Sequence, residues 1–164
     1  MPRRPSKKKT PSPAAAAPTP EFDDNEREAV LAVNRAFYRV ASDRDLEAMD
    51  QLWAPTGQVF CFHPGQAPLL DRGSVMASWK GILGHPNAPH VHCMNEVVIG
   101  RPGLAVVLCR EILPSLQLMA TNTYVRLGQR WHMIGHQSGV VPAVQLNPPP
   151  AGQPAPARDK RKLH

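Results

Sequence analysis

Four long segments rich in β-forming residues follow one another in the second half of the chain, with only short turns between them. The segments span residues 89–99, 104–113, 116–126 and 130–140, and a Gly or a Pro marks each intervening turn. Strands joined by so few residues pair antiparallel, because parallel neighbours need a crossover connection of a dozen or more residues. The sequence therefore predicts a meander of four antiparallel strands.

The preceding part of the chain has mainly helical patterning. Apolar residues at helical spacing are Val30, Val33, Phe37, Val40 and Ala41 in a first helix, and Leu46, Met49, Leu52 and Trp53 in a second. Asp43 is the expected N-cap of the second helix. A short strand is predicted at residues 58–62 and a third helix at residues 73–83, with Ser74 near its start. The predicted order is helix, helix, strand, helix and four strands, which is an α+β class.

The two ends of the chain differ in composition from the middle. Residues 1–21 are rich in Pro, Ala and basic residues, and residues 147–164 are Pro-rich and then basic, which predicts disordered tails around one domain at residues 22–146. The first twenty residues carry +5 and the last eighteen +3 of a formal net charge of +6, so the domain itself is about −2. The domain therefore has no basic footprint of a nucleic-acid-binding protein.

The tails leave two interpretations open. Basic tails bind phosphate groups non-specifically, or they remain solvated and aid solubility. We expect no specific nucleic-acid partner, because no nucleic-acid-binding motif with interleaved aromatic residues is visible. No apolar segment has the length of a membrane span or the core of a signal peptide, so we expect a cytoplasmic protein.

Cysteine and histidine spacing predicts neither a disulfide nor a metal site. Cys61, Cys93 and Cys109 are widely spaced and lie among apolar residues, as expected for reduced, buried thiols. A metal site would need a third ligand near the His-x-His pair at His90 and His92, and that pair alone is a weak signal. We therefore expect no metal and no cofactor.

Two segments place polar side chains within apolar strands, where unpaired polar groups are costly to bury. They are residues 61–65 and 120–124, and the second is soon followed by His136. Alternation places Asn122 and Tyr124 on one sheet face, where they orient a ligand or else hydrogen-bond across strands. We expect one shared pocket.

Candidate proton-transfer groups in this pocket are His63 and His136, because imidazole titrates near neutral pH. The alternative is that His63 bonds its own turn and that His136 is a satisfied core histidine. Glu96 and Glu111 are the carboxylates within the predicted strands. If either faces inward, it supplies an acid or base with a raised pKa; otherwise both are surface charges.

The three tryptophans are predicted to be core residues, with Trp53 or Trp79 bordering the pocket. Together with Trp53, further positions form a recognisable set, namely His63-Pro64-Gly65, Gly73, Ser78-Trp79, Ala120-Thr121-Asn122 and the closing strand from Trp131 to Ser138. With this element order, residues 25–141 resemble the nuclear transport factor 2 (NTF2) superfamily. Within it, they resemble the SnoaL-like proteins related to ketosteroid isomerases and polyketide cyclases.

The resemblance implies a cystatin-like fold, in which a strongly curved antiparallel sheet wraps around the N-terminal helices to form a cone. It also implies a ligand in the open end of the cone and a homodimer. It does not imply one reaction, because this architecture hosts isomerases, dehydratases, cyclases, hydrolases and non-catalytic domains.

The ketosteroid isomerase mechanism uses a carboxylate base, a tyrosine and a protonated acid. By resemblance, the tyrosine position falls on Phe37 or, one residue on, Tyr38; the base falls on Cys61; and the acid falls on Asn122. The classical mechanism is therefore disfavoured, although Tyr38, Cys61 and Asn122 remain expected ligand contacts. Two hypotheses remain: a cofactor-independent acid/base enzyme acting on a small apolar substrate, with Asn122 stabilising an oxyanion, and a non-catalytic ligand-binding or dimeric interaction module.

Overall fold

The computed structural model describes residues 22–141. The two tails predicted at residues 1–21 and 147–164, and the last five residues of the predicted domain, lie outside the described residues. Three helices and five strands are present in the described part: α1 (Asp24–Asp43), α2 (Leu46–Leu52), β1 (Phe60–Phe62), α3 (Arg72–Gly84), β2 (His92–Arg101), β3 (Leu104–Leu113), β4 (Leu116–Leu127) and β5 (Arg130–Val140). This order is the predicted one.

Each helix begins at an aspartate whose side chain accepts a hydrogen bond from the backbone N–H three residues later. These caps are Asp23, Asp45 and Asp71, with distances of 2.8, 2.9 and 2.9 Å. The predicted cap at Asp43 is wrong, because α1 continues through that residue and ends at Arg44, which adopts a left-handed conformation with φ 60°. The chain is extended again at Asp45, and α2 begins after it.

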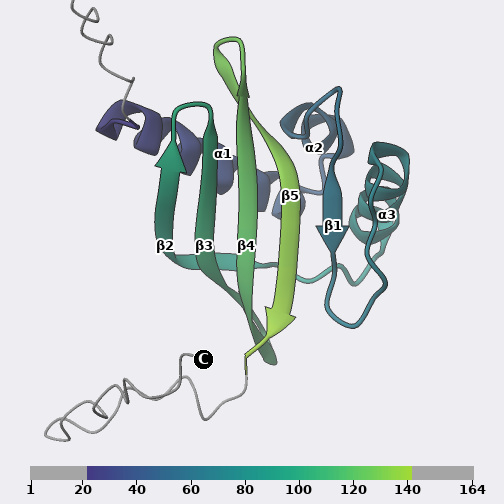
Figure 1. The fold of residues 1–164 in the computed structure, drawn as a ribbon. Helices are drawn as coiled ribbons and strands as arrows, with labels where there is room; N and C mark the ends of the chain where they lie inside the picture. The colour runs from purple at the N-terminus through teal and green to yellow at the C-terminus, as the bar shows by residue number, and fades with distance from the viewer. Residues whose placement is uncertain (1–21, 142–164) are drawn as a thin grey trace, which may run out of the picture.

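The five strands form one sheet in the order β1-β5-β4-β3-β2. Strands β2 to β5 are the predicted antiparallel meander, whereas β1 pairs parallel with β5 at the edge and makes the sheet mixed. Figure 1 shows α1 crossing behind the sheet, with α3 beside β1. The α+β architecture therefore agrees with the prediction, and its parallel pair comes from two strands far apart in sequence.

The concave face of the sheet packs against the helices. Val30, Phe37, Val107, Tyr124 and Met133 are almost fully buried in this core. Burial alternates along β3 and β4, so Ala120, Asn122 and Tyr124 share one face, as predicted, and the structure places that face inward. The interior of the cone is therefore lined by a mixture of apolar and polar side chains.

Candidate functional site

Polar side chains are concentrated on the concave face of the sheet. Those that are buried are Asn34 and Tyr38 from α1, Glu111 from β3, Asn122 and Tyr124 from β4, and His136 and Ser138 from β5. An unpaired polar group in such a place costs roughly 1–3 kcal/mol, so buried groups of this kind are expected to bond to one another. They do so as one connected network.

Glu111 is the ionisable centre of this network. Tyr38 donates its hydroxyl to Glu111 Oε1 at 2.9 Å, and Ser138 donates its hydroxyl to Oε2. Burial raises the pKa of Glu111, and the hydrogen bonds from Ser138 and Tyr38 oppose that rise. The result is a carboxyl group whose pKa is shifted toward neutrality, the direction that suits proton transfer.

His136 lies beside this carboxyl group. Its Nε2 is 3.9 Å from Glu111 Oε1, and its Nδ1 is 2.7 Å from Asn122 Oδ1. Burial, with a smaller contribution from His63, lowers the pKa of His136 to about 3. The imidazole is therefore neutral near neutral pH and adds no positive charge beside Glu111.

Asn34 connects the interior to the surface. Its Oδ1 accepts hydrogen bonds from Asn122 Nδ2 and from the Tyr124 hydroxyl, each at 2.8 Å. Its Nδ2 donates to Glu96 Oε1 at 2.8 Å, and Glu96 Oε2 pairs with Arg35 Nε at 2.9 Å. Sequence reasoning missed Asn34, although a signal was present: it is a polar residue in the apolar stripe of α1.

A small cavity reaches the network from the helical side. Its volume is about 60 Å³, and its lining residues are Phe37, Tyr38, Ala41, Trp79, Ile82, Leu83, Ala88, Pro89, Val91 and Glu111. Tyr38 and Glu111 are the polar side chains among them. A cavity of this volume has room for a few waters or for a compact ligand.

The two carboxylates singled out in the sequence have different environments. Glu111 points into the cone and is 5% exposed. Glu96 lies at the α1–β2 boundary, where it pairs with Arg35 of α1. The alternation of apolar and polar residues did not show which way the Glu111 side chain points, because both faces of β3 carry apolar residues.

His63 bonds another element of the fold. Its Nε2 lies 3.0 Å from Ser78 Oγ on α3 and 3.4 Å from Cys61 Sγ. Burial lowers the pKa of His63, and its ring centroid is 6.2 Å from that of His136. This imidazole therefore contacts both the nearby strand β1 and the helix α3.

The remaining expected ligand contacts divide between cavity and core. Tyr38 and Trp79 line the small cavity. Trp53 is fully buried beside Met133, to which it forms a backbone bridge. Cys61 is also fully buried, and burial, with Glu111 contributing, raises the pKa of its thiol to about 12. Glu111 thus lies near the position at which the resemblance places a carboxylate base.

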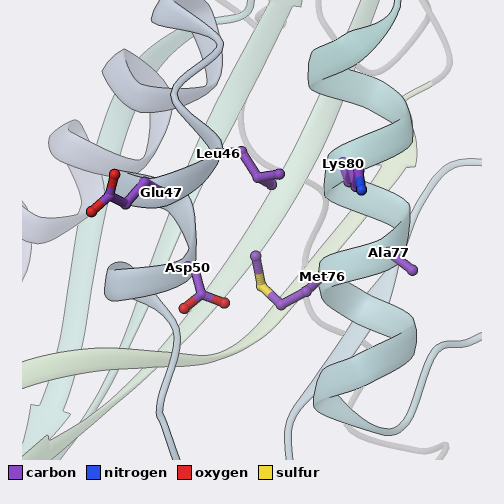
Figure 2. A pocket seen from close by; sticks show the side chains of 6 residues that line it. All are labelled: Leu46, Glu47, Asp50, Met76, Ala77 and Lys80. Carbon is purple, nitrogen blue, oxygen red and sulfur yellow. The ribbon is translucent and has the colours of Figure 1, made fainter.

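A larger groove of about 620 Å³ lies between α2 and α3. Figure 2 shows Leu46 and Met76 facing each other across it, with Asp50 near its lower end. Asp50 pairs with Arg72 at 2.9 Å, and no member of the buried network lines this groove. The groove is therefore separate from the Glu111 site.

Residues 22–141 contain no group of three His, Cys, Asp or Glu side chains placed to hold a metal ion. His90 and His92 are both exposed. No helix among the described residues is long and apolar enough to cross a membrane.

The fold and the polar interior of the cone define a class of small α+β pocket domains. A family model described as the SnoaL-like domain matches residues 30–143, and the chain belongs to this family. The resemblance inferred from the sequence is thereby confirmed.

Two solved structures and one curated protein illustrate the relationship. A candidate dehydratase of the NTF2-like family from Streptomyces avermitilis is 26% identical, with a TM-score of 0.68, over 73% of this chain and 99% of that chain. A candidate calcium/calmodulin-dependent protein kinase type II association domain from Thiobacillus denitrificans is 28% identical, with a TM-score of 0.62, over 68% and 94%. F-box protein SKIP8 from Arabidopsis thaliana is 24% identical over 115 residues, 69% of this chain. The chain spans 50% of that curated protein's length.

Proposed function

We propose that this domain is a cofactor-independent acid/base enzyme that acts on a small, mostly apolar organic molecule inside the cone. The observation that carries the proposal is the contact between Glu111 and Tyr38, which together form the polar part of an otherwise apolar cavity. A buried carboxyl group with a raised pKa beside a hydroxyl donor is a recurrent arrangement for moving protons.

The substrate class that fits these groups is a carbonyl compound with an acidic hydrogen on the adjacent carbon. Glu111 accepts that proton as the C–H bond breaks, and the electron pair moves to the carbonyl oxygen. Tyr38 then donates its hydrogen bond to the developing oxyanion, and Asn122 supports Tyr38 through its Nδ2 at 3.0 Å. Where the enolate is conjugated with a C=C bond, return of the proton from Glu111 to another carbon gives isomerisation. Where a hydroxyl is on the β-carbon, the electron pair forms a C=C bond as the C–O bond breaks, and Glu111 gives its proton to the hydroxyl, which leaves as water.

His136 and His63 have supporting places in this scheme. His136 lies beside Glu111, where its neutral imidazole offers a hydrogen-bonding group through a bridging water or substrate atom, whereas His63 packs next to Trp79 at the cavity wall. The similarity to a candidate dehydratase supports the same chemical class without identifying the substrate. The cavity volume of about 60 Å³ favours a compact substrate.

Deuterium exchange tests this proposal whichever product the reaction gives. The full chain is mixed in D2O with a panel of small ketones and β-hydroxy ketones, and loss of the α-hydrogen signal is followed by NMR. We expect catalysed exchange by the wild type, and its loss in Glu111→Gln and Tyr38→Phe. Glu26→Gln is the matched control, because Glu26 forms an ion pair with Arg126 at 2.8 Å and belongs neither to the buried network nor to the cavity lining. Tight binding of panel members with no exchange would count against an enzyme.

A second candidate function is a non-catalytic ligand-binding or dimeric interaction module. The small cavity favours it, and so does an apolar patch on the outer face of the sheet. The patch comprises Met94, Val97, Ile99 and Met119, with exposed fractions of 53, 54, 60 and 42%. Strand register aligns Val97 with Leu108 and Thr121 across this face. The structural similarity to a candidate kinase association domain is consistent with a second copy of this chain as the occupant.

Oligomeric state measured by light scattering tests this alternative. A homodimer that uses the outer face is expected to dissociate in Val97→Glu, because the charge would be buried at the contact. Leu70→Glu is the matched control, since Leu70 is 64% exposed in the loop between β1 and α3. A wild type that stays monomeric at high protein concentration would exclude the dimer.

A further inference from the structure

A series of hydrogen bonds leads from Glu96, which pairs with Arg35, through Asn34 and Asn122 to His136, and each residue in it donates to the one before. We propose that Glu96 and Asn34 are positioning residues that fix the tautomer of His136, so that its Nδ1 carries the hydrogen and its Nε2 faces Glu111 as an acceptor. The catalytic consequence of this arrangement rests on the proposed function, whereas the tautomer itself does not.

The direction of these hydrogen bonds is set at the surface, by the ion pair between Glu96 and Arg35. Glu96 pairs with Arg35 at 2.9 Å, and an ionised carboxylate has acceptors but no hydrogen to donate. The amide of Asn34 must therefore present its Nδ2 group to Glu96, at 2.8 Å. This orientation leaves Asn34 Oδ1 pointing into the protein.

The second amide follows from the first. Asn34 Oδ1 only accepts, so Asn122 has to turn its Nδ2 toward it, at 2.8 Å. The Tyr124 hydroxyl donates to the same oxygen, and the second hydrogen on Asn122 Nδ2 goes to the Tyr38 oxygen at 3.0 Å. Both donor hydrogens of Asn122 are then used, and its Oδ1 is left facing His136.

The imidazole of His136 is the last group in this series of hydrogen bonds. Asn122 Oδ1 only accepts, so the 2.7 Å contact requires the hydrogen on His136 Nδ1. A neutral imidazole has one N–H, so Nε2 keeps its lone pair at 3.9 Å from Glu111 Oε1. The rings of Phe37 and Trp79 pack against His136, with centroids 5.2 and 5.9 Å away, and restrict its orientation.

The tautomer decides what His136 offers to the site. With the hydrogen on Nδ1, Nε2 accepts a hydrogen bond from protonated Glu111 or from a substrate group placed between them. With the hydrogen on Nε2, the imidazole would instead donate toward Glu111 and stabilise its charged form. Glu96 and Asn34, neither of which lines the cavity, thus select between an acceptor and a donor beside Glu111.

A charge swap at the surface tests the proposal. Combining Arg35→Glu with Glu96→Lys keeps an ion pair but places a donor against Asn34. The side-chain amides of Asn34 and Asn122 are then expected to flip, and the imidazole hydrogen to move from Nδ1 to Nε2 of His136. The ¹⁵N resonances of the His136 ring report which nitrogen is protonated, in the full chain and without any substrate. The matched control swaps the Glu26–Arg126 pair, joined at 2.8 Å, by Glu26→Arg with Arg126→Glu, and should leave the tautomer unchanged.

A folded swap variant that retains the Nδ1–H tautomer would overturn the proposal. In a second variant, Asn34→Leu, the side chain has a similar size but cannot hydrogen-bond, so the series of hydrogen bonds is broken without any reversal of charge. This variant is expected to populate both tautomers, and retention of pure Nδ1–H in it would also overturn the proposal. If the tautomer responds as expected but neither the wild type nor any variant catalyses exchange of the substrate's α-hydrogen, the positioning role stands and the enzyme proposal fails.

Discussion

Asn122 and His136 are register partners on β4 and β5, and their side chains meet inside the cone with 2.7 Å between Oδ1 and Nδ1. One residue is a polar member of a strand-like motif, and the other is one of the two histidines of the closing strand. Asn122 joins the two halves of the buried network, because it bonds Asn34 and Tyr38 as well as His136. Substitutions on this pair and on Glu111 therefore test the whole site.

Glu111→Gln should abolish proton transfer while leaving the fold intact. The amide keeps the size of the carboxyl group and one oxygen to accept from Tyr38 or Ser138, but it cannot accept the substrate proton. We expect turnover of an identified substrate to fall by about 10²–10⁴-fold. Rates measured with Glu26→Gln as the control would decide the role, and an active Glu111→Gln enzyme would remove Glu111 from the mechanism.

Asn122→Asp should raise the pKa of His136 well above its value of about 3. The substitution places a negative charge 2.7 Å from Nδ1, and an opposite charge at that distance stabilises the imidazolium. An NMR titration of the His136 ring measures the change. Gln137→Glu adds a carboxylate to the next residue on the exposed face and should shift this pKa far less. Equal shifts in the two variants would contradict the assigned contact.

Local sequence signals predicted the helices and the meander well. Turn residues and apolar periodicity are local properties, so the sequence predicted the element order, the bounds of β3 and β5 and the shared face of Asn122 and Tyr124. It did not predict that this face points inward. The parallel β1–β5 pair could not, because no short turn connects those strands.

The chemistry of the site was harder to predict than the fold. Val106 and Leu108 alternate with Val107 and Cys109, so both faces of β3 are apolar, and the sequence alone did not decide whether Glu111 pointed inward. Asn34 and Glu96 are 62 positions apart, and only the packing of α1 against β2 brings them together. Residues that act through long-range contacts are those that sequence reasoning missed.

His136 should make the protein less stable as the pH falls from about 6.5 to about 3. Its pKa is lowered from 6.5 to about 3 in the folded state, so the unfolded chain binds the extra proton throughout this window and gains stability relative to the folded form. The slope from this group is at most about 1.4 kcal/mol per pH unit.

Glu111 acts with the opposite sign, which makes a comparison of variants necessary. Its folded pKa is raised, so the stability that it contributes is present below its unfolded value and declines as pH rises through its folded value. Denaturant unfolding of His136→Phe across this pH range should show a weaker acid dependence than the wild type. An unchanged dependence would mean that His136 does not carry the acid sensitivity.

Gly135→Ala should destabilise the edge of the sheet. Gly135 is the register partner of Phe60 in the parallel β1–β5 pair, and a Cβ atom built on it would overlap the Phe60 ring. Forcing extra volume into a packed site typically costs about 1–3 kcal/mol, so we expect a loss of that order in denaturant unfolding.

Two further variants separate this overlap from the general effect of adding a methyl group to β5. Gly139→Ala is on the same strand, and a Cβ there meets nothing within 4 Å, so its stability should change little. Adding Phe60→Ala to Gly135→Ala removes the ring and should recover part of the cost of the Gly135 change, when compared with Phe60→Ala alone. Equal destabilisation by the two glycine variants would show that backbone freedom, and not the close approach of β1, requires glycine at position 135.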